Sequence, residues 1–336
     1  MFSIIKHKWV YMGISFALMI ASIISLLVRG FNLDTDFAGG IAVTYEINAD
    51  FITEEVQKIV DEALGSQQSP SSIQRSNDNE VIIKFGYDNS LETEADRADF
   101  SLDRVTKITN SLQDKYGTAV VEEAQAEEAT TDEAVAEEQA DEAAEEVEAA
   151  KVVLKNQDII SPSTGKDLAR SAVWMSILAC IAILFYVTLR FEFVSGAVAV
   201  FALAHDVLLL LGLYSLLQWS VDTNFIAAIL TVLGYSINNT IVIMDRIREN
   251  TRHARKESYA EIADKSIIQT MKRSLNTTIT TLLTIGMVYI LGVKSIQVFA
   301  LPIIIGIVIG FYSSVFVAGP LWATWRDSAV KAKKKA

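Results

Sequence analysis

Six long apolar runs that are nearly free of charge dominate the hydrophobic pattern of the chain. A run of about 20 such residues forms a helix long enough to cross a hydrocarbon core about 30 Å thick. The runs span residues 10–28, 170–189, 194–217, 225–244, 276–293 and 297–320. The pattern predicts an α-helical membrane protein with six transmembrane helices, of which one precedes and five follow a long polar segment.

The first run raises the alternative of a cleaved signal peptide, because Lys6 and Lys8 precede it. Its apolar stretch is long, however, and Val28-Arg29-Gly30-Phe31 lacks a small-x-small cleavage site. We therefore interpret residues 10–28 as a retained transmembrane helix.

The polar segment, residues 29–169, has the periodicities of a small α+β domain. Alternation of apolar and polar positions predicts strands, and apolar positions at helical spacing predict helices. The expected elements are a strand at 40–47, a helix at 53–64, a strand at 80–87, a helix that ends before Gly117, and short strands at 119–121 and 152–154. The second helix is expected to bury Leu102, Val105, Ile108 and Leu112.

Residues 122–150 break this pattern, because they hold 13 acidic side chains, no basic ones and little besides alanine. The acidic pairs recur every five residues, a spacing that fits no packed helix face. Like charges repel along such a stretch, and almost nothing in it can be buried. We expect a mobile external insert; a role in attracting basic partners is the alternative.

Charge differs strongly between the polar segment and the rest of the chain. Residues 31–169 carry 32 acidic and 10 basic side chains, whereas all other residues carry 9 acidic and 19 basic ones. Basic side chains gather in residues 1–9, in the connection at 245–275 and in the tail at 321–336. Short basic loops remain in the cytoplasm. We therefore expect these three segments and both termini in the cytoplasm, and residues 29–169 outside it.

Composition narrows the classes of function. Hydrophobic residues make up 51% of the chain and the mean hydropathy is +0.31, which is too apolar for a soluble domain of 336 residues. The single cysteine, Cys180, lies in a predicted membrane helix, so the external domain is expected to fold without disulfides.

The sequence also holds no phosphate-binding loop, metal-ligand cluster or nucleophile–base pair, and its histidines are His7, His205 and His253. This predicts a protein that is not an enzyme, needs no cofactor or metal, and does not bind nucleic acid.

Polar side chains inside the predicted membrane helices are candidates for function, because such groups are costly in lipid unless they face protein or water. His205 and Asp206 lie about 12 residues into the third run, near the bilayer centre. A lone carboxylate there costs ~2.5 kcal/mol or more when it is ionised. We therefore expect Asp206 to have a partner, such as His205 or Arg273, or to lie on a watery path for ions.

Two further polar groups lie on the fourth and fifth runs. Thr231, Asn238 and Asp245 are seven residues apart and share one face, flanked by Ser236 and Asn239. A polar stripe at the start of the fifth run comprises Arg273, Asn276, Thr277, Thr280 and Thr284. Hydrogen bonds between helices, worth roughly 1 kcal/mol each, explain the threonines and Ser236 without any transport role.

Five members of these groups are nevertheless candidates for an ion pathway. They are Asn238, Asn239, Asp245, Arg273 and Thr277, in addition to Asp206. For Asp245, a salt bridge near the cytoplasmic interface is the alternative. In the sixth run, the four-residue spacing of Gly306 and Gly310 predicts a close approach of another helix.

Several short motifs follow one another across nearly the whole chain. They are Leu33-Asp34-Thr35-Asp36-Phe37-Ala38-Gly39-Gly40, Arg190-Phe191-Glu192, His205-Asp206-Val207, GYSINNTIVIMDRIREN at 234–250, and Arg273-Ser274. Their sequence and order resemble the SecF family, membrane subunits that work with SecD alongside the bacterial protein-translocation channel. The family positions include Asp34, Asp36, Phe37, Gly39, Gly40, His205, Gly234, Tyr235, Ser236 and Arg246.

This resemblance implies one half of a resistance–nodulation–division (RND) transporter: one helix, an external domain and five further helices, completed by a homologous SecD half. It also implies an accessory subunit of the Sec machinery in the bacterial cytoplasmic membrane. The implied partners are SecD, the SecYEG channel and unfolded preproteins. The family uses a proton gradient, or in some members a sodium gradient, to promote late steps of translocation. A small-molecule exporter half and a non-coupling assembly scaffold are the alternatives.

One position departs from the family pattern. Where the family carries Asn-Asp-Thr, this chain has Asn238-Asn239-Thr240, and an amide cannot release a proton near pH 7. Protons then pass through Asp206 or an acidic residue of SecD, or sodium binds oxygen atoms of Asn238, Asn239 and the threonines, or this half is chiefly structural. We favour the first or the third account.

Overall fold

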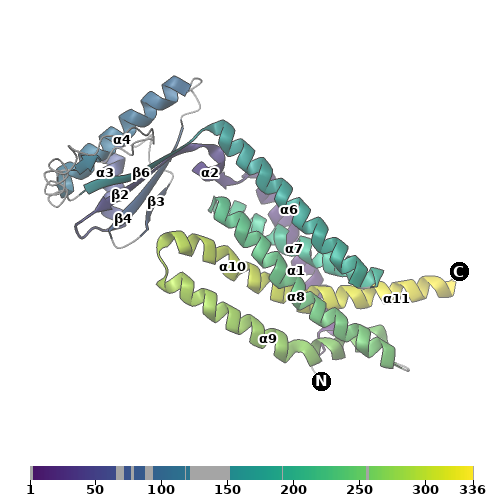
Figure 1. Cartoon of the computed structure of the whole chain (residues 1–336). Helices are drawn as coiled ribbons and strands as arrows, with labels where there is room; N and C mark the ends of the chain where they lie inside the picture. Colours follow the sequence, from purple (N-terminus) through teal and green to yellow (C-terminus); the bar gives the residue numbers. More distant parts are fainter. Residues whose placement is uncertain are drawn as a thin grey trace, which may run out of the picture. The chain divides into compact units, whose positions relative to one another are not determined.

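The computed structural model describes residues 3–65, 72–76, 79–87, 94–117, 119–121, 152–190, 192–254 and 257–335 (Figure 1). The chain forms two compact units. The α+β unit holds Leu33–Ala169 and Val293–Ser295, and the helical unit holds Met1–Asn32, Arg170–Gly292 and Ile296–Ala336. The predicted acidic insert at 122–150 and Phe191 of the second motif lie outside the described residues.

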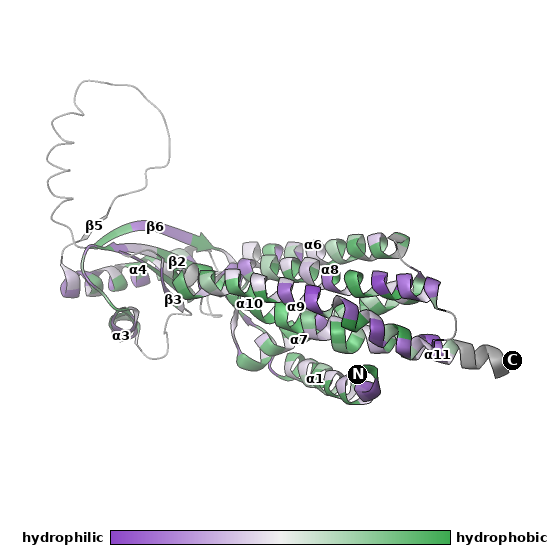
Figure 2. Cartoon of the chain, turned by 90° about the horizontal axis from the view of Figure 1, so that it is seen from below, coloured by the Kyte–Doolittle hydropathy of each residue, from purple (hydrophilic) through white to green (hydrophobic). Residues whose placement is uncertain are grey.

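The helical unit holds most of the helices, although the first residues of α6 and α10 belong to the α+β unit. The elements are η1 (Ile5–His7), α1 (Lys8–Val28), α6 (Pro162–Arg190), α7 (Phe193–Leu217), β7 (Ser220–Val221), α8 (Thr223–His253), α9 (Tyr259–Leu291), α10 (Lys294–Tyr312), the π-helix η2 (Ser313–Ala318) and α11 (Gly319–Lys335). Within the described residues, six helical stretches are long and apolar enough to cross a membrane. Figure 2 shows their apolar residues in green. The predicted six-helix membrane fold is thereby confirmed.

Helices extend well beyond the apolar runs. The segment 245–275, which we expected to be a connecting loop, is mostly helical, because α8 continues to His253 and α9 begins at Tyr259. The start of α9 is fixed by a capping box, in which Ser258 and Glu261 each accept a hydrogen bond from the other's backbone N–H. The tail at 321–336 is likewise helical through Lys335. The length of an apolar run indicates which part of a helix lies in the hydrocarbon core of the membrane, whereas capping residues determine where the helix starts.

The α+β unit is built on a five-stranded sheet of order β3-β4-β2-β6-β5. Its elements are β1 (Asn32–Leu33), α2 (Thr35–Ala38), β2 (Gly40–Ile47), α3 (Thr53–Leu64), β3 (Ser72–Arg75), β4 (Glu80–Gly86), α4 (Glu94–Tyr116), β5 (Ala119–Val121) and β6 (Val152–Ile160). The central strand β2 pairs antiparallel with β4 and β6, and β5 runs parallel to β6. The predicted α+β class is confirmed, while β3 and the second half of β6 were not expected.

The core of this unit shows where the expected helix face was wrong. Val105, Ile108 and Leu112 of α4 are buried as expected, but Leu102 is 67% exposed. The buried stripe continues instead through Ser101, four residues before Val105, which keeps the regular i, i+4, i+7 spacing. The apolar character of Leu102 therefore did not decide which side of α4 faces the sheet at this point.

Candidate functional site

A buried carboxylate lies where three elements of the helical unit meet. Asp206 of α7 is 1% exposed and His205 beside it is 0% exposed. The Nδ1 atom of His205 lies 3.0 Å from Oδ1 of Asp206. The other carboxylate oxygen, Oδ2, accepts hydrogen bonds from the hydroxyl of Ser236 on α8 and, at 2.8 Å, from that of Ser313 on η2. The structure thus brings together residues that are 107 positions apart in the sequence.

Small residues allow these elements to approach so closely. The hydroxyl groups of Thr240 on α8 and Ser314 on η2 lie 2.9 Å apart. A Cβ atom added to Gly310 would lie 3.0 Å from Cβ of Ser236, and one added to Gly306 would lie 3.0 Å from Cβ of Val232. The close approach that the Gly306/Gly310 spacing predicts is therefore confirmed, with α8 as the neighbouring helix.

The π-helix η2 gives the site its shape. A π-helical turn is wider than an α-helical one and occurs mostly as a short segment at functional sites. Here it separates α10 from α11. Its neighbouring residues Ser313 and Ser314 bond to two different helices, Ser313 to Asp206 of α7 and Ser314 to Thr240 of α8. Both serines are almost fully buried. Sequence reasoning missed Ser313; its signal was a Ser-Ser pair three residues after Gly310, in an otherwise apolar run.

Helix α1 joins the site through hydroxyl groups. The ring of His205 lies nearly parallel to that of Tyr312, with centroids 6.5 Å apart. The hydroxyl of Tyr312 lies 3.1 Å from that of Ser15 and donates to the carbonyl of Tyr11, both on α1. The buried residues of α1 are Ser15, Ser22 and Ser25. This helix is therefore held by small polar residues, as is common between membrane helices.

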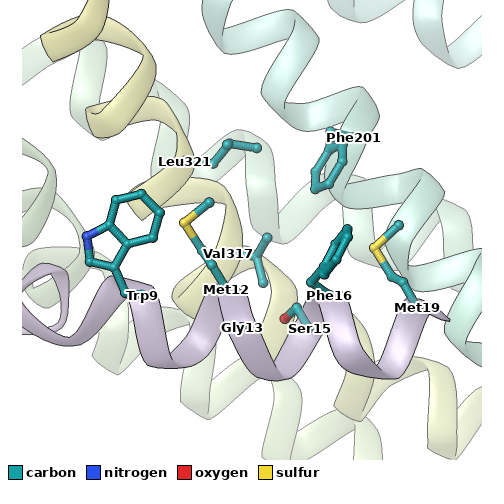
Figure 3. A pocket seen from close by; sticks show the side chains of 9 residues that line it. All are labelled: Trp9, Met12, Gly13, Ser15, Phe16, Met19, Phe201, Val317 and Leu321. Carbon is teal, nitrogen blue, oxygen red and sulfur yellow. The ribbon is translucent and has the colours of Figure 1, made fainter. Parts of the chain in front are cut away.

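An apolar groove runs beside α1 (Figure 3). Its volume is about 300 Å³, and it is lined by Trp9, Met12, Gly13, Ser15, Phe16, Met19, Phe201, Val317 and Leu321. Ser15 is the one lining residue with a hydroxyl group. Because carbon atoms cannot replace the hydration of an ion, this groove is unsuited to ion passage.

The two neighbouring asparagines of the long motif differ in exposure on α8. Asn239 is 4% exposed, and its Nδ2 atom has no hydrogen-bond partner among the described residues. Asn238 is exposed, as are Thr231 and Asp245 on the same face. Tyr235 donates a hydrogen bond of 3.3 Å to Thr278 of α9. The predicted group on α8 thus divides into a buried side with Ser236 and Asn239, and an exposed side.

A second exposed polar surface lies on α9. The side chains of its predicted stripe, Arg273, Asn276, Thr277, Thr280 and Thr284, are all exposed. The threonine hydroxyls donate to backbone carbonyls one turn earlier, for example Thr280 to Asn276 at 2.9 Å. We call these five residues, together with Thr231 and Asn238, the α8–α9 polar face. Arg273 therefore lies on the surface, whereas Asp206 is paired with His205.

The Asp-Arg-Ile-Arg-Glu-Asn part of the long motif connects α8 to α9. Arg246 donates from Nε to Gln269 at 2.7 Å, and Asn250 donates to Ser266 at 2.8 Å and to Gln269 at 2.9 Å. The motif has a structural role in this chain, since these bonds hold the two helices together below the apolar runs.

Two other family motifs are also explained by packing. Glu192 of the Arg190-Phe191-Glu192 motif forms an ion pair with Arg326 of α11. In the α+β unit, Lys84 of β4 lies 2.8 Å from Asp34 and 3.6 Å from Asp36. The short helix α2, which follows Asp34 and contains Asp36, buries Phe37. Gly39 follows this helix with φ +80°, a conformation that favours glycine.

Among the described residues, no group of three or more His, Cys, Asp or Glu side chains could hold a metal ion. The candidate functional site in the helical unit is therefore the Asp206 cluster, in which an apolar bundle encloses a carboxylate, an imidazole and hydroxyl groups. Such a set can bind and release a proton.

Comparison with known proteins places the chain in a family. Residues 139–328 match the family model "Protein export membrane protein SecD/SecF, C-terminal". The SecF protein translocase subunit of Sebaldella termitidis is 33% identical over 321 residues, which cover 95% of this chain and 90% of that protein. The SecF subunit of Acidaminococcus fermentans is 33% identical over 330 residues, which cover 97% of this chain and 97% of that protein.

Longer relatives contain a matching portion. The SecDF protein translocase subunit of Bacillus subtilis is 30% identical over 97% of this chain, which spans 38% of that protein. The crystal structure of SecDF from Thermus thermophilus, described as a translocon-associated membrane protein, superposes with a TM-score of 0.68 at 27% identity and covers 97% of this chain and 39% of its own. These matches and the geometry of the helical unit agree: the chain belongs to the SecD/SecF family of protein-export membrane proteins.

Proposed function

We propose that the chain is an accessory subunit of the bacterial Sec protein-export machinery that uses a proton gradient to promote late steps of preprotein translocation. The observation that carries this proposal is the fully buried carboxylate of Asp206, which is bonded to α8 and η2 as well as to its own helix. Adding a proton to Asp206 changes the hydrogen bonds that hold these elements together. Proton binding is thereby coupled to the arrangement of the helices.

The atoms around Asp206 favour a proton over a sodium ion. A hard cation needs several oxygen lone pairs directed at it. Around the ionised carboxylate, hydrogen atoms of Ser236 and Ser313 point at Oδ2, and a ring nitrogen of His205 faces Oδ1. At position 239, where the family pattern has a carboxylate, the buried amide nitrogen of this chain is a hydrogen-bond donor as well.

The second part of the proposal concerns SecD. The SecF-like portion of the SecDF relatives is continuous with further chain, which supports SecD as the partner of this chain. We propose that the α8–α9 polar face packs against the SecD half. Polar side chains on the outside of a membrane helix are costly in lipid and are expected to face protein or water. The SecYEG channel and unfolded preproteins would complete the assembly.

We also propose the orientation in the bacterial cytoplasmic membrane. The basic segments at 1–9, 245–275 and 321–336 support a cytoplasmic location for both termini. Residues 29–169, which include most of the α+β unit, then lie on the extracytoplasmic side, where this unit would meet preprotein leaving the channel.

Asp206→Asn tests the coupling proposal. The change keeps the size and the polarity of the side chain but removes its ability to exchange a proton. Preprotein export is measured in inverted membrane vesicles that contain this chain and SecD, with a proton gradient, a sodium gradient or neither. We expect the variant to lose all stimulation by the proton gradient, while export without a gradient is unchanged.

Asp103→Asn is the matched control, because Asp103 is exposed on α4 and pairs with Lys107 at 2.7 Å. Full stimulation in Asp206→Asn would refute the role of Asp206. If only a sodium gradient stimulates export by the unaltered protein and only a proton gradient stimulates export by Asn239→Asp, then residue 239 selects the ion. If neither gradient stimulates export by the unaltered protein, the chain is an assembly scaffold.

The α8–α9 polar face leads to a second prediction. Replacing Asn276 and Thr280 together by leucine is expected to weaken association with SecD about tenfold. Each interhelical hydrogen bond in a membrane is worth roughly 0.6–1 kcal/mol, and two are removed. Co-purification of SecD at graded detergent concentrations measures this loss.

The control for this change is Leu283→Ala, which alters an exposed apolar residue of the same helix. Equal retention of SecD by both variants would place the SecD contact elsewhere. A variant that loses SecD and confers sensitivity to drugs, with normal protein export, would instead favour a small-molecule exporter half.

A further inference from the structure

The Asp206 cluster contains a buried ring nitrogen of His205 that lacks a hydrogen-bond partner among the described residues. The carboxylate accepts hydrogen bonds on both of its oxygens, and the hydroxyls of Ser236 and Ser313 are used in making them. The remaining ring nitrogen of His205, Nε2, is buried and has no hydrogen-bond partner in the part of the chain that the structure describes. A buried polar atom without a partner costs about 1–3 kcal/mol, so its presence calls for an explanation.

The state of the ring follows from the state of the carboxylate. When the carboxylate of Asp206 is ionised it only accepts hydrogen bonds, so in that state Nδ1 of His205 carries the hydrogen atom that faces Oδ1. A neutral imidazole has a single N–H group, and Nε2 is then a bare lone pair. An incoming proton can bind this lone pair without first breaking a hydrogen bond to Asp206.

We propose that His205 is the residue through which Asp206 exchanges its proton. A proton arriving at Nε2 forms an N–H bond there, and the proton on Nδ1 passes to Oδ1 of Asp206. The N–H bond at Nδ1 breaks, an O–H bond forms on the carboxyl group, and the imidazole is neutral again in its other tautomer. This inference rests on the proposed function of Asp206 and names the route by which that residue is loaded.

The surroundings hold the ring in the orientation that this transfer needs. On one edge Nδ1 is fixed by Asp206, and on one face the ring lies against Tyr312, with an angle of 28° between the ring planes. Tyr312 is in turn fixed to α1 through Ser15 and the carbonyl of Tyr11. Among the described residues, the titratable partners of the ring are Asp206 from α7 and Tyr312 from α10. Serine hydroxyls bond to these two partners: Ser236 of α8 and Ser313 of η2 to Asp206, and Ser15 of α1 to Tyr312.

His205→Asn is the first test, because the amide of asparagine can replace Nδ1 as a donor to Asp206 but cannot pass a proton on. In the vesicle assay with SecD and a proton gradient, we expect gradient-dependent export to fall at least tenfold, with normal amounts of the assembled complex. His253→Asn, which alters an exposed histidine of α8, is the matched control and should retain full export.

A second test separates proton transfer from packing. In His205→Ala, added imidazole should restore gradient-dependent export, whereas pyrazole, which has the same size but is a much weaker base, should not. Full activity of His205→Asn would overturn the proposal, and so would restoration by both compounds or by neither. If Asp206→Asn keeps full stimulation, the coupling role proposed for Asp206 is refuted. If Asp206→Asn abolishes stimulation and His205→Asn does not, Asp206 keeps its role and only the relay through His205 is refuted.

Discussion

Replacing Gly212 by alanine is expected to push α1 away from α7 and to destabilise the helical unit by about 1–3 kcal/mol. A Cβ atom at this position would overlap Cβ and Oγ of Ser22 and would lie 2.6 Å from its Cα atom. Because a Cα atom cannot rotate away as a side chain can, the two helix backbones must separate. The neighbouring 3.0 Å contact between the hydroxyls of Ser25 and Ser215 would be lost with them.

The thermal unfolding midpoint of the detergent-solubilised protein measures this effect, and hydrogen exchange in α1 locates it. Gly13→Ala is the control, because Gly13 lies on α1 and has nothing within 4 Å of an added Cβ atom. It should leave the midpoint unchanged or raise it slightly, since alanine favours helix more than glycine does. Equal midpoints for Gly212→Ala and Gly13→Ala would contradict the close contact.

Replacing Gly40 by alanine is expected to disrupt the α+β unit to a similar or greater extent. An added Cβ atom would lie 2.6 Å from the carbonyl oxygen of Phe85 and 2.7 Å from a methyl group of Thr35. The carbonyl belongs to β4, the antiparallel neighbour of β2, so relief requires the two strands to move apart. We expect faster hydrogen exchange across β2 and β4, with the helical unit unaffected.

Gly86 provides the matched control for this prediction. It is the residue of β4 that pairs directly with Gly40, yet a Cβ atom added there would meet only the carbonyl oxygen of Gly39, at 4.0 Å. Gly86→Ala should therefore leave hydrogen exchange almost unchanged. Similar exchange in the two variants would mean that the carbonyl of Phe85 is not as close to β2 as the structure has it.

Features that depend on local pattern were predicted well from the sequence. The strand at 40–47 has the predicted bounds, because its burial alternates residue by residue from Ile41 to Ile47. The six membrane spans follow from apolar length alone. The pairing of Asp206 with His205 was also among the expectations, since the side chains of adjacent residues can rotate toward each other.

Features that depend on packing within the membrane were not predictable in the same way. Helix α7 is apolar nearly all round, so apart from His205 and Asp206 its sequence does not mark the buried side, which also carries Ala199 and Ala202. On α8, the neighbouring Asn238 and Asn239 have the same side chain, so residue type does not show that Asn239 is buried while Asn238 is exposed. The bond from Ser313 to Asp206 depends on a π-helical turn, which has no periodic signature in the sequence.

The serine contacts of α1 have a consequence for the order of assembly. A serine hydroxyl in a lone membrane helix can bond to a carbonyl of the preceding turn, so α1 is stable in lipid before any partner exists. Its partners α7 and η2 are synthesised much later, after the whole α+β unit. Pairing then gains its energy from close backbone contact and not from the release of water. Of the six spans described, α1 is thus made before the other five and yet is among the last to reach its final neighbours.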